Sequence, residues 1–110
     1  MELIFIETPE FADKIDRIAS LEDFIHLQGE LLANPVKGKI EKGTGGARKI
    51  RMGLRGSGKS GGAGIIYYFV DHRGEIWFLD VHQKSKKESL TDKEKNHLYR
   101  FIKEVINEEE

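Results

Sequence analysis

The chain has 110 residues, of which 38% are hydrophobic and 34% charged, with no cysteine and a formal net charge of −1. One domain of this length can bury about two-thirds of the surface of its unfolded chain, so we expect a single domain over residues 1–110. The lack of cysteine excludes disulfides and thiolate metal sites. Because no secretory signal or apolar run of membrane-spanning length is evident, we expect a cytoplasmic protein.

Charge is distributed unevenly along the chain. Residues 1–36 hold two basic and eight acidic residues (−6), residues 37–59 hold eight and one (+7), and residues 60–110 hold eight and ten (−2). The three sums add up to the net charge of −1. The near-neutral total therefore conceals a cationic middle segment, which points to a polyanionic partner.

The N-terminal third predicts one strand and two helices. The short apolar run at residues 3–6 predicts a strand buried on both faces. Pro9 suits a first helical turn, and apolar residues recur behind it at helical spacing. A second helix is expected from Leu21 to about Ala33, capped by Ser20 and stopped by Asn34-Pro35.

The rest of the chain predicts three strands and a final helix. Strands are expected near residues 48–52, 65–70 and 76–82, joined as an antiparallel meander. The sequence Thr91-Asp92-Lys93-Glu94 forms a capping box that opens a helix with an apolar stripe. The predicted order is βααβββα, an α+β domain with its helices mainly on one face of the sheet, so that the other face is left free.

Strand alternation gathers charged side chains on that free face. Lys49 and Arg51 should project together, opposite Ile50 and Met52. In the third strand of the meander, Asp80 and His82 share one parity, and Lys84 continues it just beyond the end of the strand. With the glycine-rich loop 53–64, these side chains are expected to form one cleft.

The glycine-rich loop also matches a nucleotide-binding pattern. Residues 53–60, GLRGSGKS, fit the phosphate-loop pattern G-x-x-x-x-G-K-[ST], and residues 56–61 fit G-x-G-x-x-G. Either motif needs a helix directly after it to present amides to the phosphates. Residues 61–70 instead favour a strand, so we do not expect nucleotide binding. A surface loop without a role is the simpler alternative.

Several stretches together resemble a known toxin family. The segment Gly43–Arg51 (GTGGARKIR), the Gly/Lys-rich loop and the strand sequence IIYYF at residues 65–69 resemble the HigB branch of the RelE/ParE superfamily. The resemblance implies a toxin of a type II toxin–antitoxin pair. Such a toxin cleaves messenger RNA in the A site of the 70S ribosome without metal or cofactor, and is inactivated by a helix-turn-helix antitoxin similar to HigA.

The residues of the predicted cleft fit that chemistry. RNA cleavage without a metal needs a base for the 2′-OH, a cation for the phosphoryl charge and an acid for the leaving group. Lys49 is the expected base, because neighbouring like charges favour its neutral form. Arg51 would hold the phosphate, and Lys84 or His82 would be the acid. Further expected substrate contacts are Arg48, Arg55, Lys59, Gly64, Lys86 and Tyr68, the last of which could stack on a base.

Two positions depart from the family pattern. Gly64 stands at the start of the IIYYF strand, where relatives carry an arginine that binds the scissile phosphate, and Leu90 stands where some carry a tyrosine. The chain could therefore be an attenuated toxin, or Lys59 or Arg55 could have taken over the phosphate. At the strand start an arginine in place of Gly64 is expected to face solvent.

Two other functions compete with a ribonuclease. One is a ParE-like inhibitor of DNA gyrase, and the other is a plain RNA-binding module. The paired Lys49 and Arg51, with Lys84 across the sheet, favour the ribonuclease. The antitoxin is expected to lie along the acidic, partly apolar N-terminal strand and first two helices.

Overall fold

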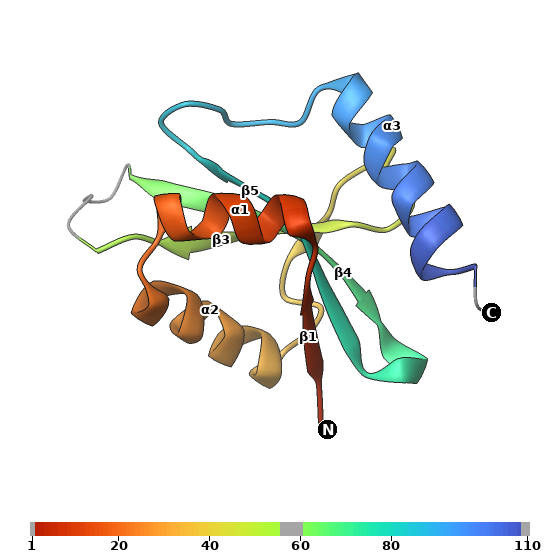
Figure 1. Ribbon diagram of the computed structural model, residues 1–110, viewed down its shortest axis with the longest axis horizontal. Coiled ribbons are helices and arrows are strands. Elements are labelled where there is room, and N and C mark those ends of the chain that lie inside the picture. Colours follow the sequence, from red (N-terminus) through yellow and green to blue (C-terminus); the bar gives the residue numbers. More distant parts are fainter. Residues whose placement is uncertain (1, 56–60, 109–110) are drawn as a thin grey trace.

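The computed structural model describes residues 2–55 and 61–108. Within them one sheet has the strand order β1-β5-β4-β3-β2, and β1 is parallel to β5 while all other pairs are antiparallel (Figure 1). The strands are β1 (Ile4–Glu7), β2 (Lys39–Ile40), β3 (Arg48–Gly53), β4 (Gly62–Val70) and β5 (Glu75–Gln83). The predicted meander is therefore confirmed, and a two-residue strand, β2, extends it.

The helices begin where their capping residues predict. They are α1 (Pro9–Ile18), α2 (Leu21–Ala33) and α3 (Asp92–Phe101), which continues into a π-helical turn, η2 (Ile102–Ile106); a short 3-10 turn, η1 (Asp71–Arg73), joins β4 to β5. The side chains of Thr8, Ser20 and Thr91 accept hydrogen bonds from the first turns of α1, α2 and α3. These bonds satisfy backbone N–H groups that have no partner inside the helix.

One core lies between the sheet and the helices α1 and α2. The rings of Phe11, Phe24 and Phe78 pack at centroid distances of 5.0–5.4 Å. Ile50 and Met52 of β3 belong to this core and are 6% and 1% exposed. The predicted parity of β3 is thus confirmed, and Lys49 and Arg51 project from the opposite face.

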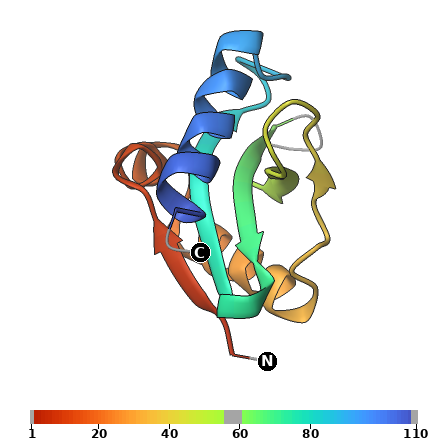
Figure 2. The same cartoon turned by 90° about the vertical axis from the view of Figure 1, so that its right-hand side faces the viewer.

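That opposite face is partly covered by α3, so the expectation that it would be free is wrong. Leu98 and Ile102 pack with Ile66 and Leu79 of the sheet in a second core. In Figure 2, α3 runs along β5 on this side of the sheet. The physical reason is that β4 and β5 are apolar on both faces, and each face needs cover from water. The end of the face near the start of β4 stays open.

A β-bulge in β5 sets which side chains reach this second face. Ile66 pairs with Asp80 whereas the next residue, Tyr67, pairs with Phe78, so Leu79 has no partner across the ladder. Because of the bulge, Phe78 and Val81 both lie in the first core, although regular alternation would place them on opposite faces. Such an extra residue re-aims the rest of a strand, which here places His82 opposite Gly64.

The chain that connects α2 to β3 is held by Tyr67. Its buried hydroxyl accepts a hydrogen bond from Gly38 N at 2.9 Å and donates one to Pro35 O at 2.8 Å. Beyond the connector, Gly43, Gly45 and Gly46 have φ of 87°, 79° and 117°, which permits the tight turn into β3.

The element that follows the glycine-rich loop does not fit the nucleotide-binding motifs. Residues 56–60 of the loop, including Lys59, lie outside the described residues. β4 starts at Gly62, so a strand follows the loop where a phosphate loop needs a helix. In the described part of the chain no helix is long and apolar enough to cross a membrane.

Candidate functional site

Three neighbouring strands form the floor of a cationic cleft. Arg51 of β3 pairs with Gly64 of β4, which pairs with His82 of β5, so the three residues lie on one line across the sheet. The loop after β5 closes one side. The cleft has a volume of about 280 Å³ and is lined by Lys49, Arg51, Ala63, Gly64, His82, Lys84, Lys87 and Glu88.

The cations of the cleft differ in how they are held. Lys49 Nζ donates a hydrogen bond to the backbone oxygen of Glu88, and Lys87 pairs with Glu94 at the start of α3. The charged ends of Arg51 and Lys84 form no ion pair with another described residue. These two side chains are therefore the ones most available to an incoming anion.

His82 is the buried titratable group of the cleft. Its side chain is 9% exposed, and neither ring nitrogen has a hydrogen-bond partner among the described residues. Burial lowers the pKa of His82, the charge of Lys49 lowers it further, and Asp80 opposes both effects. The imidazole is therefore neutral at neutral pH and can accept a proton.

Gly64 is required by close packing above His82. A Cβ atom at this position would lie 2.8 Å from His82 Nε2 and 3.0 Å from Lys49 Cε. The residue is buried, so the expectation that a side chain at position 64 faces solvent is wrong. Lys49 and His82 meet over the glycine and occupy the space that a larger residue would need.

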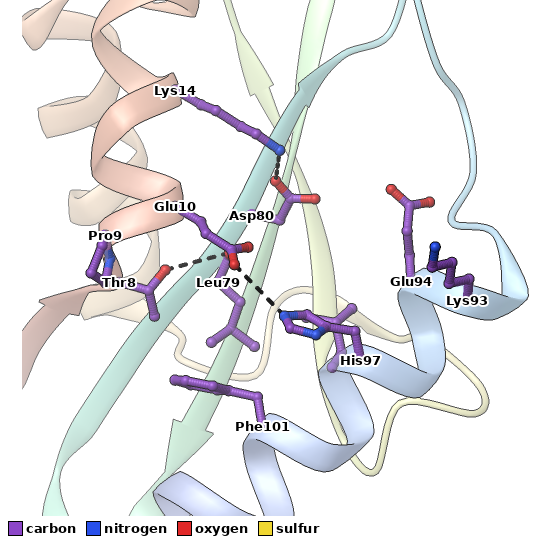
Figure 3. Close-up of a pocket in the computed structure, with 11 residues that line it drawn as sticks. Thr8, Pro9, Glu10, Lys14, Leu79, Asp80, Lys93, Glu94, His97 and Phe101 are labelled. Carbon is purple, nitrogen blue, oxygen red and sulfur yellow. Dashed lines mark hydrogen bonds and ion pairs between the residues drawn. The ribbon is translucent and has the colours of Figure 1, made fainter.

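Asp80 belongs to a separate groove between α1 and α3. Its carboxylate accepts a hydrogen bond from Lys14 Nζ at 2.8 Å, which ties α1 to β5 (Figure 3). The groove has a volume of about 400 Å³ and apolar side chains such as Leu79, Leu98 and Phe101 in its lining. His97 Nε2 lies 3.8 Å from Glu10 Oε1 across the groove. Asp80 was expected in the cationic cleft and is instead held here by Lys14.

Other predicted contact residues lie outside the lining of the cleft. Arg55 pairs with Glu22 of α2 at 2.7 Å. Arg48 donates to the backbone oxygen of Gly38 at 2.7 Å and so fastens the connector. Tyr68 packs against the second core.

Lys86 is exposed in an open hollow beside the cleft, together with Lys84 and Lys87. Lys87 and Glu88 line the cleft itself and were not predicted to do so. The lysine-rich run KSKKE directly after β5 is the sequence signal that could have indicated them, because it continues the chain from His82.

The described elements define an α+β domain whose mostly antiparallel sheet carries a cationic cleft beside its C-terminal helix. No known protein-family profile matches the chain. Among solved structures, the fold is similar to that of the E. coli toxin RelE, determined as a mutant in the free state, with a TM-score of 0.60. The two chains are 19% identical, and the match covers 80% of this chain and 90% of RelE. The protein thus has a RelE-like fold, and membership of the HigB branch stays a prediction.

Proposed function

We propose that this protein is a toxin of a type II toxin–antitoxin pair that cleaves messenger RNA on the ribosome in the cytoplasm. The observation that carries the proposal is the buried neutral His82 beside Lys49, with Arg51 and Lys84 in the lining of the same cleft and neither of them in an ion pair with a described residue. A proton acceptor surrounded by cations suits a phosphodiester, whose reaction needs both. The RelE-like fold adds support by analogy.

Four residues of the cleft have a role in the proposed reaction. Neutral His82 takes the proton of a ribose 2′-OH, whose oxygen attacks the adjacent phosphorus while the bond to the 5′-oxygen breaks. Arg51 and Lys49 stabilise the charge that builds on the phosphoryl oxygens. Lys84 gives a proton to the leaving 5′-oxygen. The products are a 2′,3′-cyclic phosphate and a 5′-hydroxyl.

This assignment changes two of the roles expected from sequence. Lys49 was the expected base and His82 a candidate acid. Because burial keeps His82 unprotonated at neutral pH, it is better suited to accept a proton than to give one. Both ring nitrogens are buried, so side chains of the cleft must move before the 2′-OH reaches the imidazole. Lys49, which is held by the carbonyl of Glu88, is the side chain that we expect to move toward the phosphate.

Ribosome dependence follows from the size of the cleft. A volume of about 280 Å³ holds one phosphate and its neighbouring groups, and offers little with which to orient a free RNA strand. The ribosome would supply that orientation. The attenuation hypothesis for Gly64 carries an additional structural requirement. An arginine at this position must displace His82 and Lys49 before it can reach a phosphate.

The test is mapping of messenger RNA ends in a bacterial cell-free translation system. We expect cuts with the native chain, none on naked RNA, and a loss of about 100-fold or more in Lys49→Ala, Lys84→Ala and His82→Asn. Lys39→Ala is the matched control, because this exposed lysine of β2 is not part of the cleft lining.

Undiminished cutting in the cleft variants would refute the ribonuclease assignment. Inhibition of gyrase supercoiling without any RNA cleavage would favour the ParE-like alternative instead. If the native chain cuts only weakly and Gly64→Arg raises cutting by on the order of 10², the chain is an attenuated toxin.

A further inference from the structure

The loop that joins β5 to α3 (Figure 1) is fastened at both of its ends. At its start, Lys86 N and Lys87 N both donate hydrogen bonds to Gln83 O at 3.0 Å. Near its other end, Leu90 is buried in the second core. The segment between these points, residues 87–89, supplies two residues to the lining of the cationic cleft.

Two lysines hold this segment against the cleft. Lys49 reaches across from β3 and donates a hydrogen bond to the backbone oxygen of Glu88. Lys87 forms an ion pair with Glu94 in the first turn of α3, and the two side chains are 30% and 34% exposed. Ion pairs that are partly open to solvent are of moderate strength. Both contacts join a cation to an oxygen, so the oxygens of a phosphate can replace either of them.

The state of His82 shows that the cleft is closed in the free chain. Both ring nitrogens are buried without a hydrogen-bond partner among the described residues, although His82 belongs to the cleft lining. Burial lowers the pKa of His82 most, and Lys87 also lowers it while Glu94 raises it, so this ion pair lies close to the ring. A buried polar group without a partner is unfavourable, which indicates that the ring is to gain one when the cleft opens.

We propose that the segment 87–89 is a lid over His82, and that Glu94 is a positioning residue that latches this lid through Lys87. The closed lid keeps solvent and RNA from His82. It opens when phosphates of the RNA bind Lys49 and Lys87 and so release them from Glu88 and Glu94. The inference rests on the proposed function, which supplies the RNA.

The experiment measures how fast diethyl pyrocarbonate, which reacts with unprotonated imidazole nitrogens, modifies His82 in the full chain without RNA. Mass spectrometry of the peptides gives its initial rate relative to that of the exposed His26. In the native chain we expect His82 to react at least about tenfold more slowly than His26. Glu94→Gln and Lys87→Met should each raise the relative rate of His82 by about three- to tenfold, because each removes the latch.

Controls separate the latch from a general loss of stability. Lys87→Arg keeps the ion pair and should leave the rate within about twofold of the native value. Glu30→Gln breaks a comparable ion pair, with Lys37, in which the Glu30 side chain is 29% exposed, and should also leave the rate unchanged. A glutamine at position 94 still accepts the hydrogen bond from Thr91 N, so Glu94→Gln retains the helix cap.

The outcomes separate this inference from the proposed function. An unchanged rate in either Glu94→Gln or Lys87→Met, or a native His82 that reacts as fast as His26, would overturn the lid and leave the toxin assignment standing. In the translation system, Glu94→Gln should raise cutting by about threefold, because it frees Lys87 and keeps its charge. Cutting at or below the native level would overturn the latching role. A native chain that never cuts, while His82 is modified as expected, would count against the proposed function alone.

Discussion

His82 is held in the cleft by two neighbours that act on it in different ways. Lys49 opposes its protonation by charge, and Gly64 leaves the space that its ring occupies. A larger residue at position 64 would push the ring away, and loss of Lys49 would let it protonate more easily. The proton-accepting state of His82 therefore depends on both residues.

We expect the pKa of His82 to lie below its ordinary value of 6.5 and to rise toward it in Lys49→Met. NMR titration of the imidazole Cε1 proton measures both values, with Lys39→Met as the control. An unchanged midpoint in Lys49→Met would show that the two side chains are not coupled.

The same shift links stability to pH. Because the unfolded chain binds the histidine proton at a higher pH than the folded chain does, the free energy of unfolding should fall as pH drops below 6.5. This decrease in the free energy of unfolding should level off below the pKa of His82 in the folded chain. His82→Gln should reduce this part of the pH dependence.

The packing above His82 makes Gly64 sensitive to substitution. In Gly64→Ala the new methyl group meets His82 Nε2 at 2.8 Å, and the buried ring has little room to move. We expect a loss of about 1–3 kcal/mol in the free energy of unfolding. Urea unfolding measures it. In the control Gly53→Ala, where no atom lies within 4 Å of the added Cβ, a change as large as that of Gly64→Ala would contradict the steric explanation.

At the scale of elements, the start of α3 is anchored to the loop that closes the cleft. Lys87 of the loop pairs with Glu94, and Glu94 also accepts a hydrogen bond from Thr91 N in the capping box. The bond from Lys87 and then the bond from Thr91 lower the pKa of Glu94 to about 2. The position of Lys87 in the cleft thus depends on the helix cap.

We expect Glu94→Gln to lower the free energy of unfolding by about 1 kcal/mol at pH 7, since the side chain is 34% exposed and solvent weakens the ion pair. A depressed carboxylate pKa stabilises the fold above the ordinary value of 4.5. The difference from the native chain should therefore shrink as pH falls from 4.5 toward about 2. Denaturant unfolding at several pH values measures it, and Glu104→Gln, at the far end of this helix, should show no such pH dependence.

At the scale of the whole molecule, the sheet separates two surfaces of different charge. The helices α1 and α2 lie together in one layer, apart from α3 (Figure 1). Residues 9–33, which form α1 and α2, hold six acidic and two basic residues, whereas the cleft beside α3 is lined by cations. Under the proposed function, an RNA strand would be attracted to the side that carries the cleft.

Binding of short single-stranded RNA should be weak and should weaken further with salt. Neutralisation of two to four phosphates, one in the cleft and the others by the lysines beside it, predicts a slope of log K against log salt of roughly −1.5 to −3. Lys84→Ala should reduce the magnitude of the slope by about 0.7. Fluorescence anisotropy measures the affinities, and Lys103→Ala, which is exposed outside the cleft lining, is the control. An equal slope change in both variants would place the RNA outside the cleft.

The sequence by itself determined the main helices and strands and, for β3, the side from which each residue projects. Alternation placed Lys49 and Arg51 opposite Ile50 and Met52, and the capping residues located each helix start. These features are local, because they depend on neighbours within one turn or on the period of two in a strand. The predicted grouping of Lys49 and Arg51 followed from parity, whereas His82 reaches their face only because the bulge in β5 reverses the alternation after Phe78.

Only the tertiary structure decided which groups meet across the molecule. Alternation gives two faces to a strand but does not say which helix covers either of them, so α3 on the second face could not be predicted. Asp80 does not lie in the cleft, because Lys14, 66 residues away in sequence, pairs with it. The contact of His82 with Gly64 depends on the register between two strands and on a bulge, and neither is set by the residues next to them in sequence.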